Sequence, residues 1–274
     1  MGLQINTNVA ALNAYRNLSG TQNAMSTSLE RLSSGLRINR AADDAAGLAI
    51  SETLRGQANG LNQATANAQD AISLIQTAEG GLNESHSILQ RMRQLTVQAG
   101  NDTNTGAART AIGAEITQLA TELTRISDTT QFNGTKLLDG SASSLVFQVG
   151  ANAGETLSVT TLATDSDETA LAVGGLDVST SGAVATSLAA IDAAITTIST
   201  KRGDLGAVQN RLQHTVNSLA VAAENTTAAE SRIRDTDMAK EMTTFTKSQI
   251  LSQAGVAMLA QANSAPQSVL KLLG

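Results

Sequence analysis

The sequence predicts a mainly α protein: long helices in coiled-coil or bundle packing, a small β-hairpin region, and N- and C-terminal segments paired with each other. Near both ends, apolar residues recur at alternating intervals of three and four, which is the spacing of a coiled-coil seam. The single proline, Pro266, leaves most of the chain able to form unbroken helices. Aromatic residues make up only 1% of the chain, so aliphatic side chains must build the core. Such a composition favours slender helices packed side by side over a thick globule.

The first predicted helix ends in the polar run Ser33-Ser34-Gly35 and leads into a charged connector over residues 37–55. Its predicted seam consists of Ala11, Tyr15, Leu18, Gln22, Met25, Leu29, Leu32 and Leu36. In the connector, Asp43 and Asp44 could form a carboxylate pair for acid–base chemistry. The preferred interpretation is that they form salt bridges with Arg37 and Arg40.

Two further seams follow. The second has stride-seven positions Leu61, Ala68, Ile75, Leu82 and Leu89, with partner slots Ala64, Ala71, Ala78, Ser85 and Met92. Its helix contains Gly80-Gly81, which weakens it locally, and should end near Gly100, where turn-forming residues begin. The third seam is Ile112, Ile116, Leu119, Leu123 and Ile126.

The period then changes to two, which indicates a β-hairpin region at about 130–160. Phe132-Asn133-Gly134 predicts a turn, and Leu145, Phe147 and Val149 alternate with polar or outward positions. After it, residues from about 160 to 187 are rich in Thr, Ser, Gly, Ala and Asp. This composition predicts a short, variable and weakly ordered connection.

The longest seam lies towards the C-terminus. Its core positions are Ile191, Ile198, Leu205, Leu212 and Leu219, followed by a last helix that contains Met238, Met242, Phe245, Ile250, Leu251, Met258 and Leu259. The terminal seams have little to pack against except each other. We therefore expect three parts: an inner coiled-coil domain of 1–36 with 236–274, the connector 37–55, and a rod-like domain over 56–235.

Several function classes are disfavoured by composition. The net charge is −6 with no basic stretch, so we expect no nucleic-acid partner. The N-terminus lacks the pattern of a secretory signal, and no segment is expected to insert in a membrane. There is no cysteine, and the histidines His86 and His214 lie far apart among polar neighbours. We therefore expect no enzyme activity, no catalytic residue, no cofactor and no metal site.

The ordered motifs of the chain resemble those of bacterial flagellins. The resemblance covers about residues 1–160 and 185–274, and rests on Ile5-Asn6-Thr7-Asn8, Glu30-Arg31-Leu32-Ser33-Ser34-Gly35-Leu36-Arg37-Ile38-Asn39, Asp43-Asp44-Ala45-Ala46-Gly47, Gln131-Phe132-Asn133-Gly134, Gln148-Val149-Gly150-Ala151-Asn152, Arg202-Gly203-Asp204-Leu205-Gly206-Ala207-Val208-Gln209-Asn210-Arg211, Gln253-Ala254-Gly255 and Leu259-Ala260-Gln261-Ala262-Asn263. With only a short middle, the chain resembles a short form without large outer domains.

The resemblance implies a homopolymer: the tubular filament of the bacterial flagellum, outside the cell, used for swimming. It implies export of the unfolded chain through the flagellar type III apparatus with an export chaperone, and contacts with hook-associated junction and cap proteins. The residues expected to polymerise through the inner coiled coil are Leu18, Met25, Leu29, Leu32, Met242, Phe245, Leu251 and Leu259.

The resemblance also implies recognition by innate immune receptors. Gln90, Arg91, Leu95 and Glu115 match the segment read by Toll-like receptor 5, and Arg91 and Leu95 are expected to share an exposed helix face. Alternatively, these residues make only subunit contacts. The apolar C-terminal patch is Val269, Leu270, Leu272 and Leu273. It is expected to cap the inner bundle, and the resemblance adds recognition by NAIP receptors.

Two other interpretations stay open. A hook–filament junction protein shares the terminal pattern, although the closing residues 269–273 favour flagellin. A secreted enzyme or adhesin on a helical stalk would need a folded insert within 160–187, and that stretch is too short for one.

Overall fold

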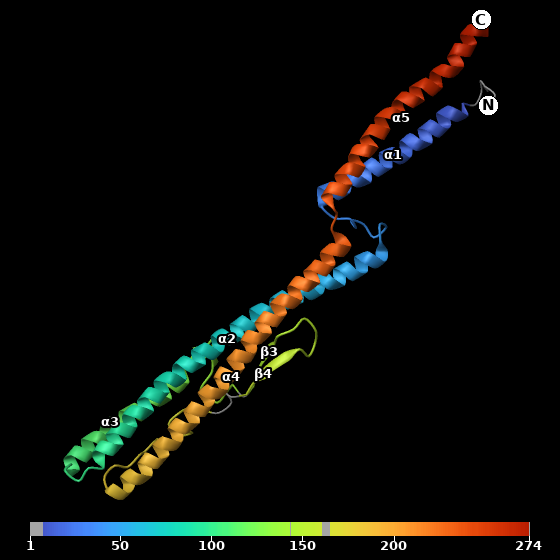
Figure 1. Cartoon of the computed structure of the whole chain (residues 1–274). Helices are drawn as coiled ribbons and strands as arrows, with labels where there is room; N and C mark the ends of the chain where they lie inside the picture. Colours follow the sequence, from blue (N-terminus) through green and yellow to red (C-terminus); the bar gives the residue numbers. More distant parts are fainter. Residues whose placement is uncertain (1–7, 143, 161–164, 274) are drawn as a thin grey trace. The chain divides into compact units, whose positions relative to one another are not determined.

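A computed structural model of the chain describes residues 8–142, 144–160 and 165–273, with side chains described up to residue 264. Helices dominate this part of the chain, and the strands form two small hairpins (Figure 1). The elements are α1 (Val9–Ser34), α2 (Ala45–Ala99), α3 (Gly106–Thr129), β1 (Gln131–Phe132), β2 (Thr135–Lys136), β3 (Leu145–Gln148), β4 (Thr156–Val159), α4 (Ser181–Arg234) and α5 (Met238–Leu273). The predicted fold class is confirmed.

The chain divides into two compact units. The first combines Met1–Gly56 with Asn225–Gly274, and the second is Gln57–Glu224. The residues predicted to form a separate connector belong to the first unit, and 45–55 are already helical. That helix begins early because the Asp44 carboxylate accepts a hydrogen bond from the Gly47 N–H at 2.8 Å, which caps the first turn of α2.

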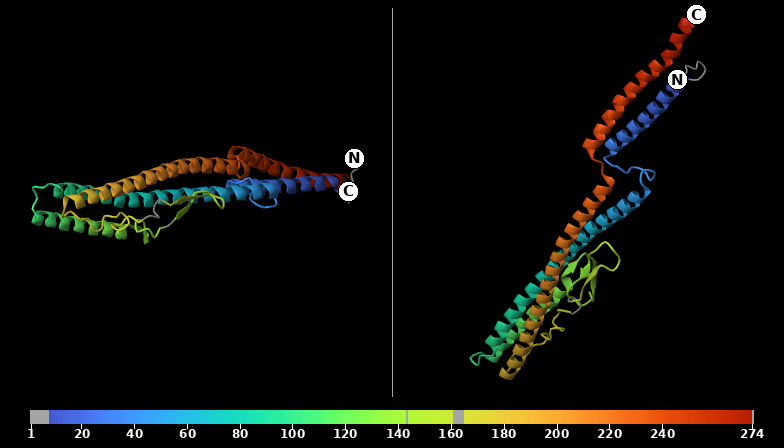
Figure 2. Two further views of the ribbon diagram at one scale, coloured as in Figure 1. Left: turned by 90° about the horizontal axis from the view of Figure 1, so that it is seen from below. Right: turned by 45° about the vertical axis from the view of Figure 1, so that its right-hand side comes forward.

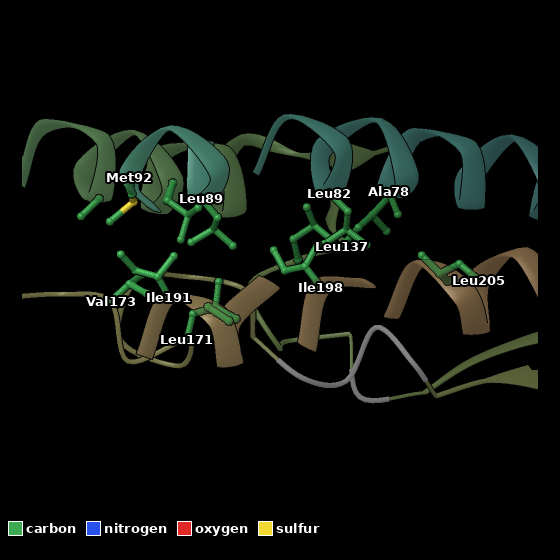
Figure 3. Close-up of a cluster of buried hydrophobic side chains, with 14 of the residues drawn as sticks. Ala78, Leu82, Leu89, Met92, Leu137, Leu171, Val173, Ile191, Ile198 and Leu205 are labelled. Carbon is green, nitrogen blue, oxygen red and sulfur yellow. The ribbon is translucent and has the colours of Figure 1, made fainter. Parts of the chain in front are cut away.

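The second unit is built on α2 and α4, whose predicted core positions are confirmed. All ten seam residues of α2 named above are buried, and so are Ile191, Ile198, Leu205, Leu212 and Leu219 of α4. Figure 3 shows Leu82 and Leu89 of α2 facing Ile191 and Ile198 of α4. Every one of the largest fully buried side chains in the described part of the chain belongs to this unit.

Helix α2 buries a wider face than one seam requires, because it has two helical neighbours (Figure 2). Arg91 of α2 pairs with Glu115 of α3 at 2.8 Å, and Arg93 of α2 pairs with Asp192 of α4 at 2.7 Å. On the face of α2 that lies between these two ion pairs, further residues are buried beside the predicted seam: Leu74, Leu95, Thr96 and Ala99.

Both predicted β features are present. Asn133 and Gly134 have φ of 48° and 79° between β1 and β2, as a tight hairpin turn of the Asn-Gly kind requires. Strands β3 and β4 pair antiparallel, with Phe147 opposite Leu157. Leu157 and Val159 are buried while Thr156 and Ser158 are exposed, so one face of this hairpin packs on the core of the second unit.

The predicted weakly ordered connection, about 160–187, is instead ordered where the structure describes it: residues 165–180 cover the core, and 181–187 already belong to α4. Leu171, Val173 and Val178 are 5%, 0% and 4% exposed, and Figure 3 shows the first two facing the helices. The backbone is held as well, since Ser166 N–H donates to the Leu138 carbonyl at 2.9 Å. The compositional prediction was wrong because it averaged these few apolar residues into a Ser- and Thr-rich stretch.

Lys201 of α4 anchors the same segment. Its Nζ donates to the Asp165 carbonyl and to the Ser166 hydroxyl, both at 2.8 Å, although the residue is only 8% exposed. Burial lowers the pKa of Lys201, and the nearby Asp165 charge opposes that shift. Nothing in the heptad pattern predicted this anchor, because its partners Asp165 and Ser166 lie 36 and 35 residues away in the sequence.

Within the described residues, α4 is also long and apolar enough to cross a membrane by length and composition alone. No such segment was expected from the sequence. Its inward side chains, among them Ile198 and Leu205, are fully buried in the second unit, and core helices of this kind meet the same criterion. The absence of membrane insertion stays a prediction.

Candidate functional site

In the first unit, α1 and α5 lie side by side along their length (Figures 1 and 2). Their facing rows alternate partly covered large residues with small ones. Ser28 and Ser248 are 3% and 6% exposed, and a Cβ placed on Gly255 would lie 3.2 Å from Leu18 Cδ1. Near the start of α1, the Asn8 amide donates to the Ala262 carbonyl at 2.7 Å. The helices can approach closely here because little side-chain volume separates them.

This packing corrects the predicted seam of α1. Tyr15 and Leu29 were expected in the seam but are 65% and 56% exposed, and Gln22 is exposed as well. The facing positions are one residue earlier, at Ala14, Thr21 and Ser28. The other seam positions, Ala11, Leu18, Met25 and Leu32, are partly covered as predicted, so the error lies in the intermediate positions, where small residues take the place of larger ones.

The expected polymerisation residues therefore fall into two groups. Those that are partly covered within the unit are Leu18, Met25, Leu32, Phe245 and Leu259. Those that are exposed are Leu29, Met242 and Leu251, at 56%, 51% and 49%. For the exposed group, the inner coiled coil of one chain leaves about half of each side chain in solvent.

Other large apolar side chains of the first unit are exposed too. They are Val9, Leu12, Tyr15, Ile50, Met238, Ile250, Val256 and Met258. On α5 they occur on both flanks and on the back of the helix, away from α1. An exposed apolar surface of this kind favours burial against another molecule.

Two shallow grooves run among these side chains. One lies on α5 and is lined by Met242, Thr243, Thr246, Lys247, Ile250 and Leu251. The other lies between the two helices, where small residues leave room beneath larger ones; it is lined by Ala10, Ala14, Asn17, Leu18, Thr21, Leu251, Ala254, Gly255 and Met258. The first unit thus presents both apolar projections and apolar hollows.

Next to this helix pair, the chain passes twice, at residues 36–37 and at residues 233–235, and hydrogen bonds join these two segments. Leu36 and Asp235 form an antiparallel bridge, Arg37 N–H donates to the Arg234 carbonyl at 2.7 Å, and the Arg37 guanidinium bonds the Ile233 carbonyl. Arg234 in turn pairs with Glu52 at 2.7 Å. A hydrogen bond from Arg234, with help from the charge of Arg55, holds the pKa of Glu52 below its ordinary value.

The predicted salt bridges of Asp43 and Asp44 with Arg37 and Arg40 do not form. Arg40 pairs with Glu30 at 2.8 Å instead. Asp43 accepts backbone hydrogen bonds from Arg40 and Asn39 at 2.9 and 3.1 Å, and these bonds lower its pKa. Both aspartates instead accept hydrogen bonds from backbone N–H groups and cap turns. A short acidic side chain reaches a nearby backbone N–H group more easily than it reaches the charged end of a long arginine side chain. This arrangement gives no support to acid–base chemistry.

The predicted receptor-like surface on α2 and α3 is only partly exposed. Gln90, Arg91 and Glu115 are exposed, and Arg91 pairs with Glu115. Leu95, however, is 2% exposed and belongs to the core of the second unit. The expectation that Leu95 faces outwards was wrong, because it assumed a single seam on a helix that packs against two neighbours.

The remaining predicted positions add no site. The side chains of Val269, Leu270, Leu272 and Leu273 lie outside the described residues. His86 bonds Gln90 through its Nε2 at 2.9 Å, and His214 is exposed on α4. Within the described ranges, no group of three or more His, Cys, Asp or Glu side chains could hold a metal ion.

Taken together, long paired helices and a large apolar surface on the terminal unit define a helical structural protein that is built to associate. Comparison with known proteins gives the family. The bacterial flagellin N-terminal helical region matches residues 5–143, and the C-terminal helical region matches residues 188–273. The chain belongs to the bacterial flagellin family, whose members are structural filament proteins and not enzymes.

Individual relatives agree over nearly the whole chain. Flagellin from Halalkalibacterium halodurans is 53% identical over 269 residues, which cover 98% of this chain and 99% of that protein. Flagellin from Bacillus subtilis is 50% identical, and the match covers 99% of this chain and all of that protein. The crystal structure of Bacillus cereus flagellin matches with a TM-score of 0.50 and 32% identity, over 60% of this chain and 94% of that one.

Proposed function

We propose that this chain polymerises through the apolar surface of its α1–α5 pair, with a second copy of the chain as the partner. As a member of the flagellin family, the chain is a structural subunit of a flagellar filament. The observation that supports this particular surface is the reversal of packing between the two units. The second unit fully buries its largest apolar side chains, whereas α1 and α5 only partly cover theirs, as at Leu18 and Phe245, or leave them exposed, as at Ile250.

Burial by neighbouring copies gives this reversal a physical reason. Leu12, Ile250 and Met258 are 55%, 60% and 64% exposed in one chain. Each buried side chain of this size contributes about 1.5–3 kcal/mol, so several of them from each subunit can supply the free energy of association. The hollow between α1 and α5, floored by Ala14 and Gly255, can accept projecting side chains from the next copy.

The proposal is tested with Leu12→Ser and Ile250→Ser, and with Gln253→Ser as an exposed polar control on α5. Growth of seeded filaments is followed by sedimentation and electron microscopy. Each apolar substitution should raise the critical concentration for growth about fivefold or more, because losing an interface anchor commonly costs over about 1 kcal/mol. Unfolding of the free chain should not change, since both side chains are exposed. Wild-type growth by both variants would refute this surface.

We further infer that the filament lies outside the cell, and that the chain reaches it unfolded through the flagellar type III apparatus with an export chaperone. At the ends of the filament, hook-associated junction and cap proteins would meet the same terminal helices. The family assignment supports these proposals. An exported-fraction assay in a strain without the export apparatus tests them: filament protein should then stay in the cell.

Receptor recognition is a separate proposal. For Toll-like receptor 5, the surface is reduced to Gln90, Arg91 and Glu115, because Leu95 is buried. Arg91→Ala and Glu115→Ala should weaken signalling without loss of the fold, since an exposed ion pair contributes less than about 1 kcal/mol to stability. For NAIP receptors, the proposed determinant stays the 269–273 patch. Normal signalling by both α2 and α3 variants would leave these residues as subunit contacts only.

A further inference from the structure

The sulfur atoms of this chain are distributed unevenly. There is no cysteine, and there are six methionines. Three of them lie on α5: Met238, Met242 and Met258 are 47%, 51% and 64% exposed. By contrast, Met92 is 0% exposed in the core of the second unit. The exposed methionines share the helix with the apolar surface assigned above to self-association.

We propose that Met238, Met242 and Met258 are a modification site for two-electron oxidants such as hydrogen peroxide, and that their oxidation blocks incorporation of the subunit. This inference rests on the proposed function of the α1–α5 surface. A thioether sulfur attacks one oxygen of the peroxide, an S–O bond forms, and the O–O bond breaks. The sulfur is oxidised to the sulfoxide, and the other peroxide oxygen leaves as water with both protons.

The product has the opposite solvation preference to the side chain it replaces. A methionine sulfoxide is polar and accepts strong hydrogen bonds, whereas the surroundings of Met242 and Met258 on α5 are largely apolar, with Ile250 and Leu251 nearby in the two grooves. Burying that oxygen against a second copy without a donor is unfavourable. Of the polar side chains that line the Met242 groove, Thr243 and Thr246 already donate to the Ala239 and Met242 carbonyls, and Lys247 is exposed.

The placement of these sulfur atoms also makes the effect depend on assembly. In the free chain they face solvent, so an oxidant reaches them directly. In a polymer that buries this surface, the same atoms would be shielded as Met92 already is. Oxidation would therefore inactivate free subunits while leaving subunits already incorporated unmodified.

The first part of the test maps the reaction. The full free chain and preformed filaments are treated with hydrogen peroxide, and added oxygen is measured at each methionine by peptide mass spectrometry. In the free chain, the three α5 methionines should react about tenfold or more faster than Met92, and in filaments that difference should largely disappear. Equal rates at Met242 and Met92 in the free chain, or equal rates at Met242 in both forms, would overturn the proposal.

The second part measures growth on filament seeds. Peroxide-treated wild type should be incorporated about tenfold less, because a buried unpaired polar group is costly. Incorporation should return after treatment with methionine sulfoxide reductases of both stereospecificities. The triple variant Met238→Leu, Met242→Leu and Met258→Leu should be incorporated equally well before and after peroxide. Inhibition of the triple variant to the wild-type extent would place the sensitive group elsewhere and overturn the inference.

Met242→Gln separates this inference from the proposed function on which it rests. Glutamine places a polar group at the same position without any oxidant. Poor incorporation of Met242→Gln together with sulfoxide-sensitive wild type supports both proposals. Poor incorporation of Met242→Gln with fully active oxidised wild type overturns the oxidation site alone. Normal incorporation of Met242→Gln argues against the assembly surface itself.

Discussion

At the scale of single residues, neighbours on one helix can have opposite environments. Arg91 and Leu95 are four residues apart, which rotates one by about 40° from the other around α2. The Arg91 side chain is 53% exposed and pairs with Glu115, while Leu95 is 2% exposed. The rotation carries the second position from the edge of the α2–α3 contact into its interior. A residue there contributes to the stability of the unit and is not available to a partner.

Leu95→Ala should therefore destabilise the second unit by about 2–5 kcal/mol, the range for truncating a buried leucine. Its matched control is Val97→Ala, on the same helix but 52% exposed, which should change stability by less than about 0.5 kcal/mol. Urea unfolding of the free chain measures both. Equal effects of the two substitutions would show that Leu95 is not in a packed core.

At the scale of elements, adjacent glycines within α2 have different roles. A Cβ on Gly80 would meet nothing within 4 Å, whereas a Cβ on Gly81 would lie 2.8 Å from both Leu138 Cδ1 and Thr130 Oγ1. Leu138 is itself 2% exposed, so it has little room to move. Gly81 allows the segment after α3 to pack closely on α2, and Gly80 only weakens the helix.

Alanine substitution at the two glycines should change the stability of the second unit in opposite directions. Gly80→Ala should stabilise the second unit by about 0.5–1 kcal/mol, because alanine has the higher helix propensity. Gly81→Ala should destabilise it, because the new methyl group collides with buried neighbours. Thermal unfolding followed by circular dichroism distinguishes them. A rise in melting temperature for Gly81→Ala would mean that the contact with Leu138 relaxes freely.

The connector should respond to acid. Backbone hydrogen bonds from Arg40 and Asn39 lower the pKa of Asp43 in the folded chain. A carboxyl group with a lowered folded pKa stabilises the structure above its unfolded pKa, and that contribution is lost as the pH falls through the folded value. For aspartate this window lies below about pH 4.

Protection of the Asn39 and Arg40 amide protons should therefore fall as the pH drops below about 4, after correction for intrinsic exchange rates. In Asp43→Ala, protection at these two amides should be low already at neutral pH and should lose this acid step. Glu52, whose pKa is lowered by a hydrogen bond from Arg234, should cause a similar loss of amide protection near Arg234 as its carboxyl group is protonated. An unchanged acid step in Asp43→Ala would assign it to another group.

At the scale of the whole molecule, the two units differ in what they need from a neighbour. The second unit buries its large apolar side chains within one chain. The α1–α5 pair only partly covers its large facing residues and leaves Leu12, Tyr15 and Ile250 exposed. Isolated helices are marginal in water, so a pair that buries little large apolar surface is weakly stable by itself.

Hydrogen exchange should consequently show low protection for residues 5–30 and 245–270 in the dilute free chain, and high protection in filaments. Protection in α2 and α4 of the second unit should be high in both states. Mass-spectrometric exchange on matched samples gives the comparison. Strong protection of both terminal segments in the dilute chain would mean that the pair is stable without self-association.

The sequence by itself determined the features that depend on local period and turn chemistry. The stride-seven positions from Leu61 to Leu89 and from Ile191 to Leu219 are buried as predicted, because a 3.5-residue apolar period keeps one face of a helix towards its partner. The Asn133-Gly134 turn was predictable because few residue pairs adopt positive φ twice in succession.

Only the tertiary structure decided how many neighbours each face has and how closely they approach. Leu95 is buried because α2 has a second helical neighbour, which the seam does not encode. Ala14, Thr21 and Ser28 replace Tyr15, Gln22 and Leu29 in the α1 seam because close approach of the helices favours small side chains over large ones. Residues 165–180 pack on the core through three apolar side chains that composition alone could not distinguish from a solvated loop. Each outcome depends on residues distant in sequence, and a local period carries no information about them.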